Sequence, residues 1–353
     1  MTALITRLFT PNIGVYWVCC IIWLFCITGS ANTESNTEAK ATQANINSKT
    51  IPRAHTGDIE PMKDLDTVEL DHTPDVKNND PVQTVPHVNF GIAAKRLWLE
   101  SAGMVGLLTY TGFSDWKWGT ASFRFNSEGW FGMDTGSGGM DKLGHLYGTY
   151  AISELLYWRL HYYFGDTPEM TIYPAAFSML LMLYVELFDG FSVDHGWSWE
   201  DVVMDAIGAG FSFLQYALPI TAALFDLRYE YFPSKGQKGF HPIIDYAGQK
   251  YLFVFKFAGF ERLLSTPFGY LELMVGYYAR GFLKHESNRN ERETKLFVGV
   301  GLNLEQLFLK PFEKKFTPRS NVLSKASHYF QAPYTYLPVT VSERHGPRRA
   351  APK

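Results

Sequence analysis

Three segments of the chain carry ionisable residues in pairs at helical spacing within otherwise apolar sequence. The pairs, whose members lie three or four positions apart, are Asp141 and His145, Glu186 and Asp189, and Asp201 and Asp205. Residues at this spacing share one face of an α-helix. Because an isolated carboxylate in apolar surroundings must find a partner or take up a proton, we expect the three faces to converge on one polar site.

Such a site is compatible with three kinds of chemistry, and the sequence leaves all three open. The first is a divalent cation, such as zinc, manganese or magnesium. Its candidate ligands are His145, Glu186, Asp189, Asp201 and Asp205. The second is general acid–base catalysis on a membrane substrate by a cluster of Asp141, His145, Glu186 and Asp205. The third is a structural hydrogen-bond network in which Asp141 or Asp201 caps a helix.

Neighbouring residues are expected to complete this site. Lys142 would lie beside the carboxylates, and Gly208 and Gly210 would let the last helix approach its neighbour closely. His195, in the turn at 190–199, could join the site from its rim, although a solvated loop histidine is the simpler interpretation.

Four helical segments must position these residues. Apolar periodicity predicts helices at 95–113, 141–164 and 172–189, and a fourth from Ser198 to about residue 225 with a kink at Pro219. The acidic residues that follow Ser198 favour a helix start there. The last two helices are close to the length that spans a bilayer. We therefore expect either a membrane-embedded bundle or a bundle that lies against a membrane.

After Pro233 the pattern changes from helical periodicity to alternation. Strand signals occur at 250–257, 270–278 and 295–304, and a polar loop tip lies at 284–293. The predicted fold class is α+β. A helical bundle of about four helices occupies 89–232, an antiparallel β region occupies 233–324, and 325–353 forms a flexible tail.

The N-terminal part has no catalytic pattern. Arg7, the apolar run 15–27 and the small residues 29–31 predict a signal peptide over 1–31, with an uncleaved anchor as the alternative. All three cysteines lie in this segment, so cleavage would leave no thiol for catalysis, zinc binding or disulfides. Residues 32–88 are expected to form a disordered linker, because 32–85 contain no aromatic residue and ten acidic residues against five basic ones.

The composition of the chain limits the kinds of molecule that it is expected to bind. The 32 basic and 35 acidic residues give a net charge of −3, which excludes a nucleic-acid binder built on bulk positive charge. Aromatic residues make up 16% of the chain against 19% charged residues. This balance is common in proteins that meet a bilayer, so membrane lipid is the expected partner.

The ordered motifs resemble a known family. Gly139-Met-Asp-Lys-Leu-Gly-His145, Glu186-Leu-Phe-Asp-Gly-Phe191 and Ser198-Trp-Glu-Asp-Val-Val-Met-Asp-Ala-Ile-Gly208 are similar to the YfiM-type predicted periplasmic lipoproteins, as is Asp245-Tyr-Ala-Gly-Gln249. The Asp-Lys-x-x-His and Asp-x-x-x-Asn-x-x-Gly pattern also resembles VanZ-like membrane proteins, although Asp205 stands where that pattern has Asn. The resemblance covers about 95–225. It implies a shared polar site in the cell envelope of a Gram-negative-type bacterium, facing the periplasm, and it implies no reaction.

The sequence therefore predicts a membrane-associated cell-envelope protein of unassigned activity with a buried His/carboxylate site. The alternative is a membrane-embedded hydrolase or transferase that acts on a lipid or a lipid-linked envelope precursor.

Overall fold

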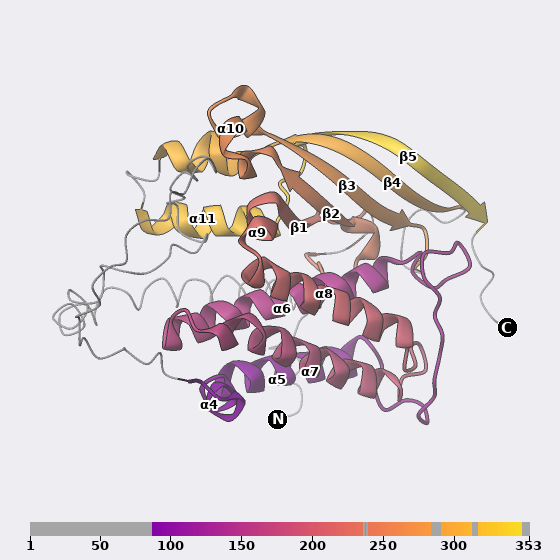
Figure 1. Cartoon of the computed structure of the whole chain (residues 1–353). Helices are drawn as coiled ribbons and strands as arrows, with labels where there is room; N and C mark the ends of the chain where they lie inside the picture. Colours follow the sequence, from indigo (N-terminus) through magenta and orange to yellow (C-terminus); the bar gives the residue numbers. More distant parts are fainter. Residues whose placement is uncertain (1–86, 236, 238, 284–290, 313–316, 348–353) are drawn as a thin grey trace, which may run out of the picture.

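The computed structural model describes residues 87–347 apart from 236, 238, 284–290 and 313–316 (Figure 1). The expected signal peptide at 1–31 lies outside the described residues, and so does the expected linker at 32–88 except for its last two positions.

The first half of the described chain is helical. Its elements are α4 (Phe90–Arg96), α5 (Trp98–Ser114), α6 (Met140–Phe164), η1 (Pro168–Thr171), α7 (Tyr173–Asp189), α8 (Trp199–Ala217) and α9 (Pro219–Leu224). The Asn89 side chain caps α4, and the Ser198 hydroxyl accepts a hydrogen bond from the Asp201 amide at the start of α8. Pro219 separates α8 from α9, so the expected fourth helix is two helices rather than one kinked helix.

The second half forms one antiparallel sheet in which neighbouring strands follow chain order. The strands are β1 (Phe225–Tyr231), β2 (Gln249–Lys256), β3 (Leu271–Arg280), β4 (Glu291–Leu302) and β5 (Tyr336–Pro347). The short connections include α10 (Glu261–Leu264), α11 (Thr317–Tyr329), η2 (Tyr246–Gly248), η3 (Phe257–Gly259), η4 (Pro267–Tyr270), η5 (Glu305–Leu309) and η6 (Lys310–Phe312). The expected α+β class is therefore confirmed.

Two predicted boundaries are wrong. β1 begins at Phe225, inside the region expected to be helical, because apolar residues there alternate with Asp226, Arg228 and Glu230, which the sheet buries. The expected flexible tail at 325–353 contains the end of α11 and all of β5. β5 pairs with β4 along its length, and as an edge strand it tolerates Pro338, which lacks a backbone donor.

The helices and the sheet pack in layers (Figure 1). α6 packs against α7 and α8 on one side and against β1 and β2 on the other. One apolar cluster, which includes Leu97, Leu156 and Leu160, fills the space between helices, and a second joins Met140 of α6 to Tyr229 and Tyr251 of the sheet. The first cluster therefore holds the second half of α6 among the helices, and the second holds its start against the sheet.

The close approach of α8 to α6 depends on one glycine. A Cβ atom at Gly208 would lie 2.1 Å from the carbonyl oxygen of Leu146 in α6. At Gly210 a Cβ atom would meet nothing within 4 Å. The expectation is therefore right for Gly208 and wrong for Gly210, which lies away from α6 on the helix.

Among the described residues, one helical segment is long and apolar enough to cross a membrane. It runs from Pro168 to Asp189, through η1 and α7, and 44% of its most apolar window is buried inside the protein. α8 fails the same test because Glu200, Asp201 and Asp205 all lie within it. Two helices were expected to be close to spanning length, and one segment of the described chain meets the criterion.

Candidate His/carboxylate site

The three ionisable pairs meet at one end of the helical layer. Asp141 and Asp201 lie in the first turns of α6 and α8, and Glu186 and Asp189 lie in the last turn of α7. The antiparallel arrangement of α7 with the other two helices places all of them together. Since helix N-termini carry partial positive charge, the starts of α6 and α8 favour carboxylates here.

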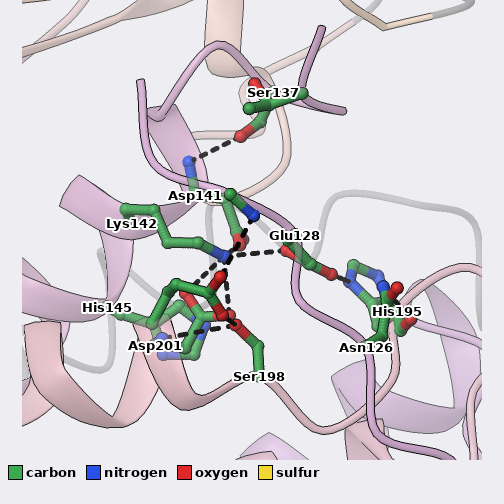
Figure 2. A network of polar contacts seen from close by, with 12 residues as sticks. Asn126, Glu128, Ser137, Asp141, Lys142, His145, His195, Ser198 and Asp201 are labelled. Atoms are coloured by element: carbon green, nitrogen blue, oxygen red, sulfur yellow. Dashed lines mark hydrogen bonds and ion pairs between the residues drawn. The ribbon is translucent and has the colours of Figure 1, made fainter. Parts of the chain in front are cut away.

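The first group of the site surrounds the ammonium of Lys142, which is 2% exposed (Figure 2). Its Nζ lies 2.8 Å from Glu128 Oε2, 3.1 Å from Asp141 Oδ2 and 2.7 Å from Asp201 Oδ1. The hydroxyl of Tyr246, which precedes β2, donates a hydrogen bond to the other oxygen of Asp141 at 2.9 Å. One buried cation therefore holds three carboxylates that come from a loop, α6 and α8.

The second group surrounds His145. Its Nδ1 lies 3.2 Å from Asp205 Oδ1 and 3.5 Å from Glu186 Oε1. The Thr149 hydroxyl donates to Asp205 Oδ1 at 2.7 Å, and the Ser198 amide donates to Glu186 Oε2 at 3.2 Å. The remaining oxygen of Glu186, Oε1, is buried and has no hydrogen-bond partner within the described part of the chain.

His145 belongs to two sets of potential ligands. In the set Asp141, His145 and Asp201, one side-chain donor atom from each residue lies within 4.8 Å of the other two. The same holds for the set His145, Glu186 and Asp205. The imidazole therefore lies between the carboxylates of the Lys142 group and those of α7 and α8.

Burial and charge change the protonation of the site. Burial raises the pKa of Glu186 to about 9, although the nearby His145 lowers it. Burial, reinforced by Asp141, raises the pKa of Glu128 to about 8. For Asp141, burial is outweighed by Lys142 and His145, which hold its pKa well below the usual range. For both glutamates, burial thus favours the protonated form over the charged form, and a nearby cation acts in the opposite direction.

Burial and nearby charges also act in opposite directions on the pKa values of Lys142 and His145. Burial alone would lower the pKa of Lys142, but attraction to Asp141, Asp201 and Glu128 raises it above its ordinary value. Burial is likewise outweighed at His145, where Asp201 and Asp205 raise the pKa well above 6.5. Both groups are therefore positively charged at neutral pH.

Asp189 and His195 lie at the periphery of the site. Asp189 accepts a hydrogen bond from the indole nitrogen of Trp118 at 2.6 Å, and neither ligand set found among the described residues includes it. The expectation of Asp189 as a metal ligand is therefore not matched by its position. His195 Nδ1 lies 4.0 Å from Glu128 Oε1, and Figure 2 shows this histidine beside Glu128 at the rim of the site.

The loop between α5 and α6 closes the site, and the sequence analysis did not include Glu128, the acidic residue of this loop that reaches Lys142. Arg124 in this loop donates to the backbone carbonyls of Ser192, Val193 and His195, and Phe125 forms a parallel bridge with Trp197. These contacts fasten the loop to the turn between α7 and α8. The acidic residues of this loop have no regular spacing, so no local signal identified Glu128.

Two further buried polar groups were also missed. Glu154 of α6 accepts hydrogen bonds from Ser212, Tyr216 and Tyr329. A network on the face of the sheet opposite to α6 joins Asp226, Arg228, Lys256, Glu272 and His328. The signal for Glu154 was its position as a lone charge in an apolar part of its helix.

One family model matches the part of the chain that contains the site. Residues 127–217 match the model of a family described as "Predicted periplasmic lipoprotein (DUF2279)". The match contains Glu128 and all of α6, α7 and α8, and thus both ligand sets. No curated protein and no solved structure shows significant similarity to the chain. The match supports a periplasmic lipoprotein-type family and confirms the expected location in the periplasm-facing cell envelope.

Proposed function

We propose that this chain is a membrane-associated envelope protein that binds a divalent cation between His145, Glu186 and Asp205. The observation that carries the proposal is the Oε1 atom of Glu186, which is buried, faces Nδ1 of His145 at 3.5 Å and accepts no hydrogen bond from the described residues. A buried carboxylate oxygen without a donor is unfavourable, and a metal ion would satisfy it.

The charges of the site support a cation. Five buried or largely buried carboxyl groups meet three basic groups, Lys142, His145 and, at the rim, His195. The carboxyl groups are Glu128, Asp141, Glu186, Asp201 and Asp205. Such an excess of carboxylates is stable only with bound protons or with a further cation.

Of the two ligand sets, His145, Glu186 and Asp205 form the better metal site. Asp141 and Asp201 are already bound by the ammonium of Lys142, so a metal ion there would have to displace it. Glu186 and Asp205 have no lysine or arginine within ion-pair distance in the described structure. One imidazole nitrogen and two carboxylate oxygens are donors that zinc and manganese accept.

The test is metal binding by the purified full chain after treatment with a chelator. We expect the wild-type protein to take up about one equivalent of Zn²⁺ or Mn²⁺, measured by elemental analysis and calorimetry. Binding should release protons, because His145 must become neutral and Glu186 must ionise to act as ligands. Glu186→Gln and His145→Ala should each weaken binding by more than about tenfold.

His161→Ala provides the matched control. His161 lies at the opposite end of α6, is 46% exposed and pairs with Asp166 rather than with the site. This variant should bind metal as the wild type does. A folded wild-type protein that takes up no metal would contradict the proposal and would support a structural network. No observation on the described residues favours the hydrolase or transferase alternative, so we propose no reaction.

A further inference from the structure

One face of the sheet is apolar and exposed. This outer sheet face consists of Phe253, Leu273, Val275, Val298, Val300, Leu337 and Val339, all of which are exposed. They alternate along β2, β3, β4 and β5 with residues on the opposite face and lie opposite one another in the register, as in Phe253, Val275 and Val298. A hollow of about 480 Å³ on this face is lined only by apolar side chains and glycine.

The opposite face of the same strands contains buried charges. Arg228 pairs with Asp226 and Glu272 at 2.6 Å each, and Lys256 also lies 2.6 Å from Asp226. A sheet with one face in water normally has apolar residues inward and polar residues outward. Here the face with the buried charges also holds a buried apolar cluster that includes Leu252 and Val254, so the sheet already has a core on one side and is still apolar on its exposed side. Exposed apolar strand faces of this kind are typical of strands whose side chains meet lipid.

The apolar surface continues from the sheet onto a helix. The ring of Phe253 contacts Phe211 of α8, with 5.9 Å between centroids, and stacks on Phe225 at 5.3 Å. From there a stripe of exposed residues follows α8. Its members are Val203, Ile207, Leu214 and Leu218, at helical spacing. The exposed apolar surface thus continues from the sheet onto the helical layer.

The two ends of the strands differ in chemistry. At the end where β3 begins, Phe260, Phe268 and Tyr270 are exposed. At the opposite end, the exposed residues include Arg280 and Arg344. Aromatic residues and charged residues flank apolar surfaces in this way at the boundaries of a bilayer.

We infer that the outer sheet face and the stripe on α8 contact the acyl chains of a lipid bilayer. None of the seven residues that define the outer sheet face is charged or polar, which matches the uncharged chemistry of acyl chains. The helices leave this face open, because α6 packs against β1 and β2 whereas β3, β4 and β5 extend away from the helical layer (Figure 1). This inference does not depend on a metal ion in the His/carboxylate site.

The test places a fluorescent probe at single positions of the full chain. In a background with Cys19, Cys20 and Cys26 replaced by serine, Val275→Cys and Val298→Cys are labelled with bimane. The labelled protein is reconstituted into vesicles of phosphatidylethanolamine and phosphatidylglycerol, with or without bromine on the acyl chains. We expect blue-shifted emission at both positions and loss of most of this emission in brominated vesicles.

Val193→Cys is the matched control. Val193 is 53% exposed, against 46% for Val275 and 43% for Val298, but it lies in the turn between α7 and α8, beside the Lys117–Asp194 ion pair. Its probe should keep the emission of a water-exposed group. A tether elsewhere in the chain would bring all three positions near the membrane alike, so the difference between positions tests the surface itself.

Two outcomes would overturn the inference. Bromine could leave the probes at Val275 and Val298 unquenched, or it could quench the Val193 probe equally. Probes that are shielded from water but insensitive to bromine would show that another protein covers the face. In that case, unlabelled protein added before reconstitution would reveal whether the cover is a second copy of the chain.

Discussion

Replacing Lys142 by methionine is expected to lower the free energy of unfolding by about 3–5 kcal/mol. Methionine keeps most of the side-chain volume but removes the ammonium that Glu128, Asp141 and Asp201 share. Their carboxylates would then stay buried without a positive partner. The measurement is urea unfolding of the full chain followed by circular dichroism.

The dependence of this loss on pH gives a second readout. Carboxyl groups left without the ammonium acquire raised pKa values in the folded protein, so they bind protons more readily than in the unfolded chain. The deficit of Lys142→Met relative to the wild type should therefore shrink as the pH is lowered from 8 towards 5. A deficit that is constant over this range would point to lost packing rather than lost charge.

Lys117→Met is the control for this experiment. Lys117 also pairs with an aspartate, Asp194, at 2.5 Å, but its side chain is 53% exposed. Exposed ion pairs contribute little, so the free energy of unfolding should change by less than about 1 kcal/mol. Similar losses for Lys117→Met and Lys142→Met would contradict the role assigned to burial.

Gly208→Ala is expected to destabilise the fold by about 1–3 kcal/mol. The added Cβ would lie 2.1 Å from the carbonyl oxygen of Leu146, which belongs to the backbone of α6 and cannot rotate away. α8 must therefore move from α6, and this movement would separate Asp205 from His145. The variant should lose metal affinity together with stability, which calorimetry and urea unfolding measure on the same sample.

Gly210→Ala, two positions along the same helix, should have the opposite effect. Its Cβ would meet no atom within 4 Å, so only the helix preference of alanine remains. We expect a gain of about 0.5–1 kcal/mol. If the two substitutions shifted stability in the same direction, the close contact between α6 and α8 would not limit the fold.

The helical half was predictable because its signals are local. Ser198 and the acidic residues after it mark the start of α8, whereas Pro219, expected to kink the helix, instead separates α8 from α9. The spacing of Asp141, Glu186 and their paired residues was enough to predict a common site. Each of these signals acts within one or two helical turns, where sequence and structure are directly related.

The missed strands depended on distant partners. Phe225–Tyr231 alternates clearly, but burial of its charges requires Glu272 and Gln331, which lie 44 and 103 positions after Arg228. β5 contains Pro338, which argues against a strand unless the position is at a sheet edge. Edge position is a property of the whole sheet, so no local pattern reveals it.

The pairing within the site was also beyond local reasoning. Whether Lys142 or His145 would neutralise a given carboxylate depends on sub-ångström placement of three helices and on Glu128 in a loop. In the structure, Asp141 and Asp201 pair with Lys142, whereas Glu186 and Asp205 lie beside His145. Helical spacing identifies the members of such a cluster but not their partners.

The hydrogen bonds of Tyr329 have a consequence for the order of folding during export. Its hydroxyl donates to Glu154 of α6 across 175 positions, and its carbonyl accepts from Tyr147 across 182. A chain that crosses a membrane from its N-terminus delivers α6 long before α11, so during that interval Glu154 can have only Ser212 and Tyr216 as its described donors. The polar core of the helices therefore closes after translocation is almost complete, and closure over such sequence distances is slow.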